Sequence, residues 1–295
     1  MQSEIVQISL GQSERIMKST FFNDVDAFAQ AAAFLTASRE AEMMNNIIVS
    51  LIPRIRSGEY PDPSMLIVRD RGAAVFAALM TPPHNLHVSS GPPSAASIIV
   101  ESLVARGIAV PGCAGIGESA DAFASAWTTK TQGTVTTRKE LTFYAATDII
   151  RPTPVPGRAR LADASDHALL MRWLEQFAVD SGLAMRERKK NPEALSNQIA
   201  AGQFFMWEHE NRTPLSVARW IPITDYGVRI GSVYTPKELR RNGYASACVA
   251  HLTQWLLSHG RTWCSLFADV ANPQANAIYR RIGYRPRFSH REYRF

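Results

Sequence analysis

A basic, glycine-containing turn lies between a strand-like segment and an amphipathic helical pattern near the end of the chain. The turn has the sequence RRNGYA at residues 240–245, with the β-branched run VRIGSVYT before it and the helical pattern ASACVAHLTQWLLSHG after it. A backbone that turns here aims several N–H groups, together with the positive end of a helix dipole, at one point in space. The feature therefore predicts a strand–turn–helix unit with an anion-binding site at the turn.

A chain of 295 residues is longer than one hydrophobic core usually serves, so two domains are expected. Residues 151–160, RPTPVPGRAR, carry three prolines and one glycine without any periodicity, which is typical of a linker. We therefore predict domains at residues 1–150 and 156–295.

Both predicted halves show a similar order of elements. In the first, a helical region at 24–56 precedes the strand-like runs MLIVRD, AAVFAALM and NLHVSS, which suggest an antiparallel meander; Pro53 is expected to end or bend its helix. A helix, a short apolar segment, another helix and a β-rich run follow. In the second half, the strands FFMWEHE, LSVARWI and VRIGSVYT stand in the corresponding places. These patterns predict an α/β fold with a mixed sheet in each half.

Composition and cysteine usage point to a soluble cytoplasmic protein. No apolar run approaches the ~18 residues needed to span a membrane, and the first 15 residues lack the basic and apolar regions of a secretory signal. The three cysteines, Cys113, Cys248 and Cys264, form no CxxC pair and suit a reducing compartment. Without a third ligand, His84 and His87 do not predict a metal site.

The net charge of +6 permits an anionic ligand but does not by itself indicate nucleic-acid binding. The late arginines would allow a nucleic-acid-binding protein, but no RNA-binding signature supports that class. We expect no nucleic-acid partner and no membrane, and a monomer or homodimer.

Two signatures in the second half resemble the GCN5-related N-acetyltransferase (GNAT) superfamily. Its cofactor motif, Q/R-x-x-G-x-G/A after a strand, is met by Arg240, Gly243 and Ala245. The second signature, on the next helix, matches at five positions: Asn272, Ala275, Tyr279, Gly283 and Tyr284. The resemblance is to a two-domain bacterial subgroup and covers roughly residues 160–295. It implies tandem acyl-CoA N-acyltransferase (GNAT) folds, the first of them degenerate.

The resemblance implies acetyl-CoA as co-substrate, bound by the turn and the preceding strand, and no metal. The pyrophosphate would take N–H groups from residues 241–246, and pantetheine would lie between strands that splay apart. Arg241 and Asn242 depart from the family, where many members carry glycine and then a basic residue. The expected cofactor-binding residues are Val233, Tyr234, Thr235, Arg240, Arg241, Asn242, Gly243, Tyr244, Ala245, Ser246 and Asn272.

The resemblance makes Tyr279 the general acid that protonates the departing CoA thiolate. The alternative is an aromatic residue that only packs on its helix. Asn272 likewise has two possible roles, as the helix N-cap with Pro273 after it, or as a pantetheine contact. For the general base the sequence offers five candidates without deciding among them: Glu208, His209, Glu210, Asp225 and the terminal carboxylate of Phe295.

In the first half, the corresponding turn reads HVSSGPPSAAS and has two prolines that remove N–H donors. We expect this half not to bind CoA, but to support the catalytic half and wall part of the acceptor pocket. The sequence thus predicts an N-acetyltransferase acting on a primary amine of a small molecule or peptide by direct attack. The alternative is a non-catalytic CoA-binding regulatory module, and a third variant keeps the fold but uses a longer acyl-CoA.

Overall fold

The computed structural model describes residues 5–7, 17–181 and 192–295, and its chain falls into two compact units. One unit comprises Met1–Thr142 and Phe288–Phe295, and the other comprises Phe143–Arg287. Most of the N-terminal stretch considered above as a possible signal lies outside the described residues. The domain boundaries at residues 150 and 156 stay a prediction.

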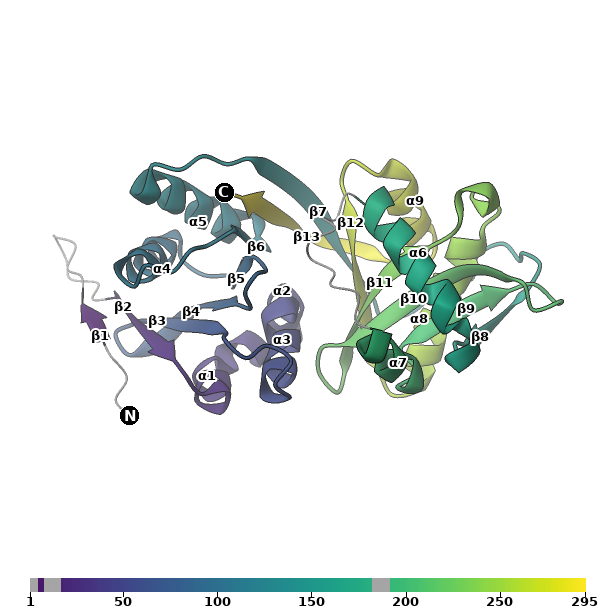
Figure 1. The fold of residues 1–295 in the computed structure, drawn as a ribbon, viewed down its shortest axis with the longest axis horizontal. Coiled ribbons are helices and arrows are strands. Elements are labelled where there is room, and N and C mark those ends of the chain that lie inside the picture. The colour runs from purple at the N-terminus through teal and green to yellow at the C-terminus, as the bar shows by residue number, and fades with distance from the viewer. Residues whose placement is uncertain (1–4, 8–16, 182–191) are drawn as a thin grey trace. The chain divides into compact units, whose positions relative to one another are not determined.

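The first unit is a mixed sheet with helices on both faces. Figure 1 shows α4 and α5 on one face, and α1, α2 and α3 on the other. Its elements are β1 (Ile5–Gln7), β2 (Met17–Phe22), α1 (Val25–Ala31), η1 (Ala33–Thr36), α2 (Arg39–Met44), α3 (Asn46–Arg56), β3 (Ser64–Asp70), β4 (Ala73–Met80), β5 (Leu86–Val88), α4 (Pro93–Ala105), β6 (Gly112–Ile116), α5 (Gly117–Thr131) and part of β7 (Thr137–Ala146). The strand order is β1-β2-β3-β4-β5-β6-β13-β7, where β13 is Arg285–Arg294.

The predicted antiparallel meander is confirmed, because β3, β4 and β5 pair antiparallel in sequence order. β5 then pairs parallel with β6. Pro53 was expected to end or bend its helix. It does not end the helix, since α3 continues through Pro53 to Arg56. Ile48, Leu51 and Ile55 on its buried face hold the helix together across the missing N–H donor.

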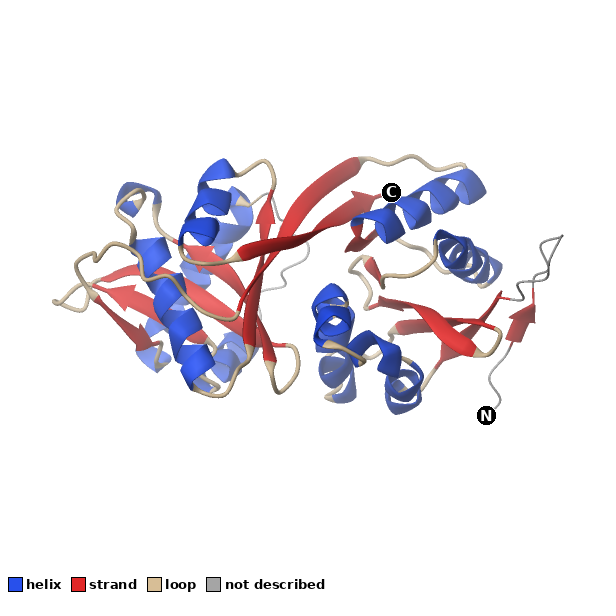
Figure 2. Ribbon diagram, turned by 180° about the vertical axis from the view of Figure 1, so that it is seen from behind, coloured by secondary structure: helices blue, strands red, loops and turns tan. Residues whose placement is uncertain are grey.

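The second unit is also a mixed sheet between helices, as the view by secondary structure shows (Figure 2). Its elements are the end of β7, β8 (Arg158–Leu161), η2 (Ala164–Asp166), α6 (His167–Asp180), α7 (Pro192–Ala200), β9 (Phe204–Glu208), β10 (Pro214–Pro222), β11 (Gly227–Tyr234), η4 (Lys237–Leu239), α8 (Tyr244–Ser258), β12 (Trp263–Asp269), α9 (Pro273–Arg281) and the start of β13. The strand order is β7-β12-β11-β10-β9-β8.

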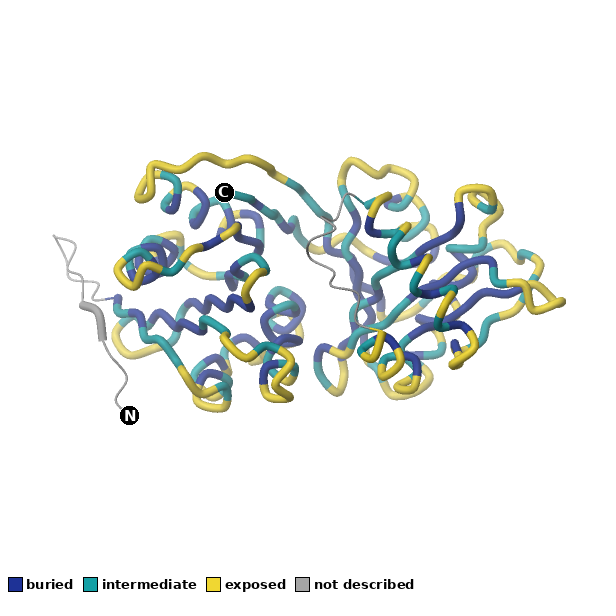
Figure 3. Tube along the Cα trace, in the orientation of Figure 1, coloured by how far each residue is buried: buried dark blue, intermediate teal, exposed yellow. Residues whose placement is uncertain are grey.

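Successive side chains along the central strands of the second unit point to opposite faces of the sheet, so its core is divided between two faces. On β9, Phe204 and Met206 pack in a cluster with side chains of α6 and α7, whereas Phe205 and Trp207 pack in a cluster with side chains of α8. A strand repeats every two residues, so a continuous apolar run such as FFMW fills both cores at once. The buried strands are the dark segments of Figure 3. The predicted α/β fold with a mixed sheet is confirmed.

None of the helices in the described part of the chain is long and apolar enough to cross a membrane.

Candidate functional site

The turn before α8 has the backbone geometry that an anion site needs. Arg241 has φ 68° and Gly243 has φ 81°, and Gly243 is the N-cap of α8. The first hydrogen bond of the helix runs from the Ala247 N–H to the Gly243 carbonyl. The N–H groups of Tyr244, Ala245 and Ser246 therefore come before the first intrahelical donor and, with the helix dipole, form a cradle for an anion.

The strands on either side of this helix pair only over their first part. β11 and β12 run parallel from the Gly227–Trp263 pair to the Ile230–Leu266 pair. Beyond that pair β11 continues to Tyr234 and β12 to Asp269. A pair of parallel strands whose ladder stops early leaves backbone groups free for a ligand.

A β-bulge marks the same place on the other edge of β11. The register with β10 shifts between Val217–Tyr234 and Arg219–Gly231, which puts one extra residue in β11. Ser232, inside that interval, has φ 48°. Bulges of this kind re-aim backbone and side chains and are frequent next to active sites. The positive φ falls on Ser232 and not on the neighbouring Gly231, although glycine is the residue that usually takes a positive φ.

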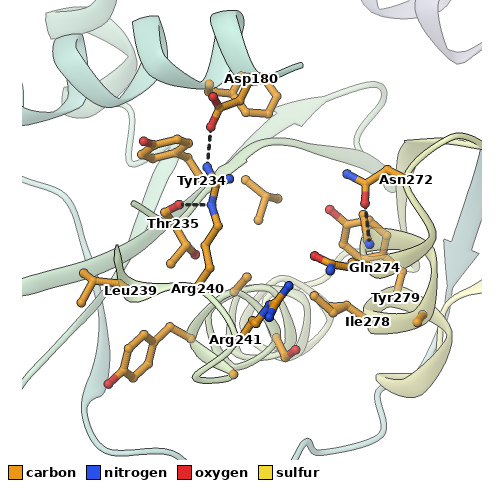
Figure 4. Close-up of a pocket in the computed structure, with 18 of the residues that line it drawn as sticks. Asp180, Tyr234, Thr235, Leu239, Arg240, Arg241, Asn272, Gln274, Ile278 and Tyr279 are labelled. Atoms are coloured by element: carbon orange, nitrogen blue, oxygen red, sulfur yellow. Dashed lines mark hydrogen bonds and ion pairs between the residues drawn. The ribbon is translucent and has the colours of Figure 1, made fainter. Parts of the chain in front are cut away.

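These features meet in a cavity of about 670 Å³, whose described lining belongs to the second unit. Figure 4 shows the turn on one side of it and α9, with Asn272 and Tyr279, on the other. The lining residues are Phe177, Asp180, Ser181, Val233, Tyr234, Thr235, Leu239, Arg240, Arg241, Gly243, Tyr244, Ala245, Ser246, Asn272, Gln274, Ala275, Ala277, Ile278, Tyr279 and Arg281.

The structure thus brings the expected cofactor-binding residues and Tyr279 together in the lining, except Asn242; Gly283 and Tyr284 of the second signature do not line the cavity. The Asn242 carboxamide donates instead to the Leu239 carbonyl, at 3.2 Å, within the turn. Sequence reasoning missed the contribution of the end of α6, namely Phe177, Asp180 and the C-cap Ser181. No motif singles these residues out, since only the packing of α6 beside β11 brings the end of that helix to the cavity. Sequence reasoning also missed lining residues that neighbour the two signatures in the chain: Leu239, Gln274, Ala277, Ile278 and Arg281.

Asn272 is confirmed in the N-cap geometry, because its Oδ1 accepts a hydrogen bond of 3.0 Å from the Ala275 N–H. Pro273 follows at the first helical position. This bond fixes the side chain by its oxygen, so the carboxamide NH₂ is the end that remains for a ligand.

Tyr279 lines the cavity and packs among other aromatic rings. Its ring centroid is 6.3 Å from that of Tyr144 and 6.2 Å from that of Tyr284. Desolvation raises the pKa of Tyr279 to about 12. The phenol is therefore protonated throughout the physiological range and is available as a hydrogen-bond donor.

Arg240 ties the turn to its surroundings. Its Nε donates to the Thr235 carbonyl at 2.9 Å, and its NH2 pairs with Asp180. Lys237 lies 3.5 Å from the same carboxylate. The hydrogen bond from Arg240 is the main cause that lowers the pKa of Asp180, and the charges of Arg240 and Lys237 add to it. The guanidinium thus anchors the turn to the end of α6, while the turn itself presents N–H groups.

The five candidate bases do not line the cavity. His209, Glu210 and Asp225 are exposed on turns. The side chain of Glu208 is completely buried and paired with Arg158 and Arg160. The ring of the terminal residue, Phe295, packs in the first unit, with its centroid 5.9 Å from that of Trp127.

The first unit arranges its corresponding turn differently. The Ser90 N–H donates to the Asn45 side chain at 3.1 Å, and α4 begins at Pro93 after Pro92. A Cβ at Gly91 would lie 2.5 Å from the Val75 carbonyl oxygen. The chain's own groups therefore take up the space and the donors that the second unit presents to its cavity.

The three cysteines are free thiols and are buried. Burial raises the pKa of each thiol. They are packing residues. His84 rests edge-on against Tyr60, with centroids 6.0 Å apart. Residues 5–7, 17–181 and 192–295 contain no group of three or more His, Cys, Asp or Glu side chains that could hold a metal ion.

Comparison with known families and structures agrees with the geometry. Residues 170–284 match the family described as "Acetyltransferase (GNAT) family". No curated protein is significantly similar to the chain.

Several solved structures share the fold over nearly the whole chain. A GCN5-related N-acetyltransferase from Sphaerobacter thermophilus is 16% identical, with 94% of this chain and 95% of that chain covered and a TM-score of 0.63. A GNAT-family acetyltransferase from Colwellia psychrerythraea is 11% identical, with 94% and 99% covered and a TM-score of 0.59. A tandem GNAT protein from the clavulanic acid biosynthesis pathway is 10% identical, with 99% and 98% covered and a TM-score of 0.52. The predicted tandem GNAT architecture is confirmed.

Proposed function

We propose that this chain, whose residues 170–284 belong to the GNAT acetyltransferase family, transfers an acetyl group from acetyl-CoA to a primary amine of a small molecule or peptide. The observation that carries the proposal is the cavity in which the N-terminus of α8 and Tyr279 lie together with the end of β11, past the point where its pairing with β12 stops. An anion cradle and a proton donor at opposite ends of one cavity suit a long, phosphate-bearing thioester.

The residues present fit acetyl-CoA. The N–H groups of Tyr244, Ala245 and Ser246 would hold the pyrophosphate, and Gly243 removes the side chain that would block its approach. Arg241 and Arg281, both exposed in the cavity lining, add positive charge. The backbone of Val233, Tyr234 and Thr235 and the free amide of Asn272 would hydrogen-bond the pantetheine arm.

The thioester supplies an activated acyl carbon. In direct attack the amine nitrogen forms a bond to that carbon, the C–S bond breaks, and the ammonium formed on the acceptor loses a proton to solvent. We assign oxyanion support to backbone N–H groups of β11 near the bulge at Ser232. The three thiols are too buried and too weakly acidic to form a covalent acyl-enzyme.

Tyr279 would donate to the sulfur as negative charge develops there. Its pKa of about 12 lies roughly 3 to 4 units above that of an ordinary thiol, so full proton transfer to a free thiolate is uphill. The phenol therefore acts by a hydrogen bond that strengthens as the C–S bond breaks, and its proton passes to sulfur as the thiol departs. Solvent, which has taken the proton of the amine, then returns a proton to Tyr279.

Asp180 is the carboxylate in the described lining, but its lowered pKa makes it a poor base. We therefore assign deprotonation of the amine to water, and assign Asp180 the task of holding Arg240. We further propose that residues 156–295 form the catalytic domain and 1–150 a degenerate copy, in a cytoplasmic monomer or homodimer.

The test is a screen of amines, amino acids, polyamines, aminoglycosides and peptides with acetyl-CoA, in which release of free thiol is followed. We expect one acceptor class to give thiol above hydrolysis, and Tyr279→Phe to lower kcat about 100-fold. The control Tyr226→Phe changes an exposed tyrosine outside the cavity lining and leaves kcat unchanged.

Two outcomes would contradict the proposal. Binding of acetyl-CoA without turnover for any acceptor class would favour a regulatory module. Faster turnover with a longer acyl-CoA would show that acetyl-CoA is not the preferred acyl donor. Calorimetric titration should give one CoA per chain, because the turn of the first unit is closed by Ser90, Gly91 and the two prolines.

A further inference from the structure

A buried asparagine joins the two ends of the segment that carries the second half of the site. Asn276 lies on α9, three residues before Tyr279, and its side chain is 8% exposed. Its Oδ1 accepts a hydrogen bond of 2.8 Å from the Tyr144 hydroxyl. Its Nδ2 donates to the carbonyls of Asp269 and Asn272, both at 2.7 Å.

These bonds use both ends of the carboxamide, and they fix its orientation. The NH₂ group faces two carbonyl oxygens, and the oxygen faces a hydroxyl donor, so a flipped amide would set oxygen against oxygen. The Asp269 carbonyl also accepts from the Asn272 N–H, at 2.9 Å. The short link between β12 and α9 is therefore held as a closed turn around one side chain.

Asn276 joins β12 to two residues that line the cavity, Asn272 and Tyr279. Asp269 ends β12, past the point where that strand leaves β11. Asn272 is the N-cap of α9, and the ring of Tyr144 lies beside that of Tyr279, with the centroids 6.3 Å apart. Asn276 itself does not line the cavity. It acts on the site through its neighbours.

We infer that Asn276, with Tyr144, is a positioning residue that sets the distance between the diverging strand β12, the Asn272 amide and the Tyr279 phenol. This inference rests on the proposed acyl transfer. A hydrogen-bonded buried amide specifies one arrangement, whereas the apolar contacts of α9 alone would allow the helix to shift along the sheet. A shift of about 1 Å at a reacting group is enough to lower a rate about 100-fold.

Two variants separate positioning from stability. Asn276→Ala removes all three bonds. Tyr144→Phe removes one bond and keeps the ring beside Tyr279, and it serves where the alanine variant does not fold. The matched control is Asn46→Ala in the first unit, which removes a buried carboxamide bonded at 2.7 Å to the Met43 carbonyl.

The first readout needs no turnover. Amide hydrogen exchange across residues 269–281 should become faster in Asn276→Ala and, less so, in Tyr144→Phe, while exchange across α8 stays as in the unmodified protein. Asn46→Ala should leave 269–281 unchanged. Unchanged exchange at 269–281 in a folded Asn276→Ala protein would overturn the inference, whatever the activity of the chain.

The second readout is a double-mutant cycle on kcat. Asn276→Ala should lower kcat about tenfold or more in the unmodified background and less than about twofold in Tyr279→Phe, because neighbours that act through one group are not additive. Losses that multiply in full would show that Asn276 does not act through Tyr279. If hydrogen exchange changes as expected but neither the unmodified chain nor any variant turns over acetyl-CoA, then Asn276 positions the site as inferred and the proposed acyl transfer is wrong.

Discussion

Val155, in the segment between β7 and β8, lies directly against Gly243 in the turn at residues 240–245, here called the anion turn. A Cβ placed on Gly243 would stand 2.9 Å from the Cγ1 of Val155. Gly243 also has φ 81°, a conformation that costs other L-residues about 1 kcal/mol or more. Two independent requirements therefore exclude a side chain at this position.

Gly243→Ala should weaken acetyl-CoA binding about tenfold, and Val155→Ala in the same chain should restore part of that loss by removing the contact but not the backbone cost. Calorimetric titration measures both. The matched control is Gly260→Ala, where φ is 90° and nothing lies within 4 Å of the new Cβ. It should lower Tm and leave affinity alone. Equal losses with and without Val155→Ala would contradict the steric part of the argument.

The second prediction concerns the role of Asp180, which could be either a general base or the carboxylate that holds Arg240 in place. Arg240 holds its pKa below the ordinary value, so the carboxylate is ionised at neutral pH but weakly basic. The ion pair is partly exposed, with side-chain exposures of 42% for Arg240 and 23% for Asp180, and such pairs contribute at most about 1 kcal/mol.

Asp180→Asn should therefore lower kcat less than about fivefold and raise the KM for acetyl-CoA modestly, as Arg240 loses one of its two partners. Steady-state kinetics with the acceptor found in the screen measures both constants. A loss in kcat near 100-fold at neutral pH that shrinks as the pH falls, where the carboxylate of the unmodified chain is protonated, would instead identify Asp180 as the general base.

The sequence predicts the anion turn well because its chemistry is local. Gly243, the basic residues and the helix that follows are consecutive, so the positive φ and the free N–H groups follow from the order of residues. The same holds for Asn272 as an N-cap. Tyr279 enters through its place in a signature, but its distance from Tyr144 depends on a strand more than a hundred residues earlier.

The parts that sequence reasoning missed depend on packing between distant elements. Asp180 reaches the cavity only because α6 lies beside β11, and Glu208 is buried only because β8 brings two arginines to it. The bulge at Ser232 appears only when β10 and β11 are aligned, since Gly231 within β11 permits a bulge but does not show which residue is the extra one.

The raised pKa of Tyr279 predicts the shape of the pH profile. Burial favours the neutral phenol and raises the pKa of Tyr279 to about 12. A phenol stops acting as a proton donor only as the pH approaches its pKa. Tyr279 should therefore add no alkaline limb to the pH profile of kcat between about pH 7 and 10. A pH–rate profile of the unmodified chain and of Tyr279→Phe checks this. A limb near pH 9 that disappears in Tyr279→Phe would show that the phenol ionises in the working range.

Glu208 should make the stability of the second unit depend on pH in the acid range. Burial by itself favours the neutral carboxyl, but the hydrogen bonds from Arg160 and Arg158 outweigh it and hold the pKa of Glu208 below its ordinary value. The folded state therefore binds this proton less readily than the unfolded chain does. The stability it contributes is present above the unfolded pKa, about 4.3, and is lost as pH falls below it through the folded value.

Glu208→Gln removes the charge and should lower the free energy of unfolding by about 2 kcal/mol at pH 7, because Arg160 loses the charge of one of its three acidic partners. The variant should also lose less stability than the unmodified chain between about pH 5 and pH 3. Denaturant titrations at about pH 7, 5 and 3 measure both effects. Glu210→Gln, which changes an exposed carboxylate two residues away, is the control and should match the unmodified chain at all of these pH values. An equal acid dependence in Glu208→Gln and Glu210→Gln would show that the buried carboxylate is not the group that titrates.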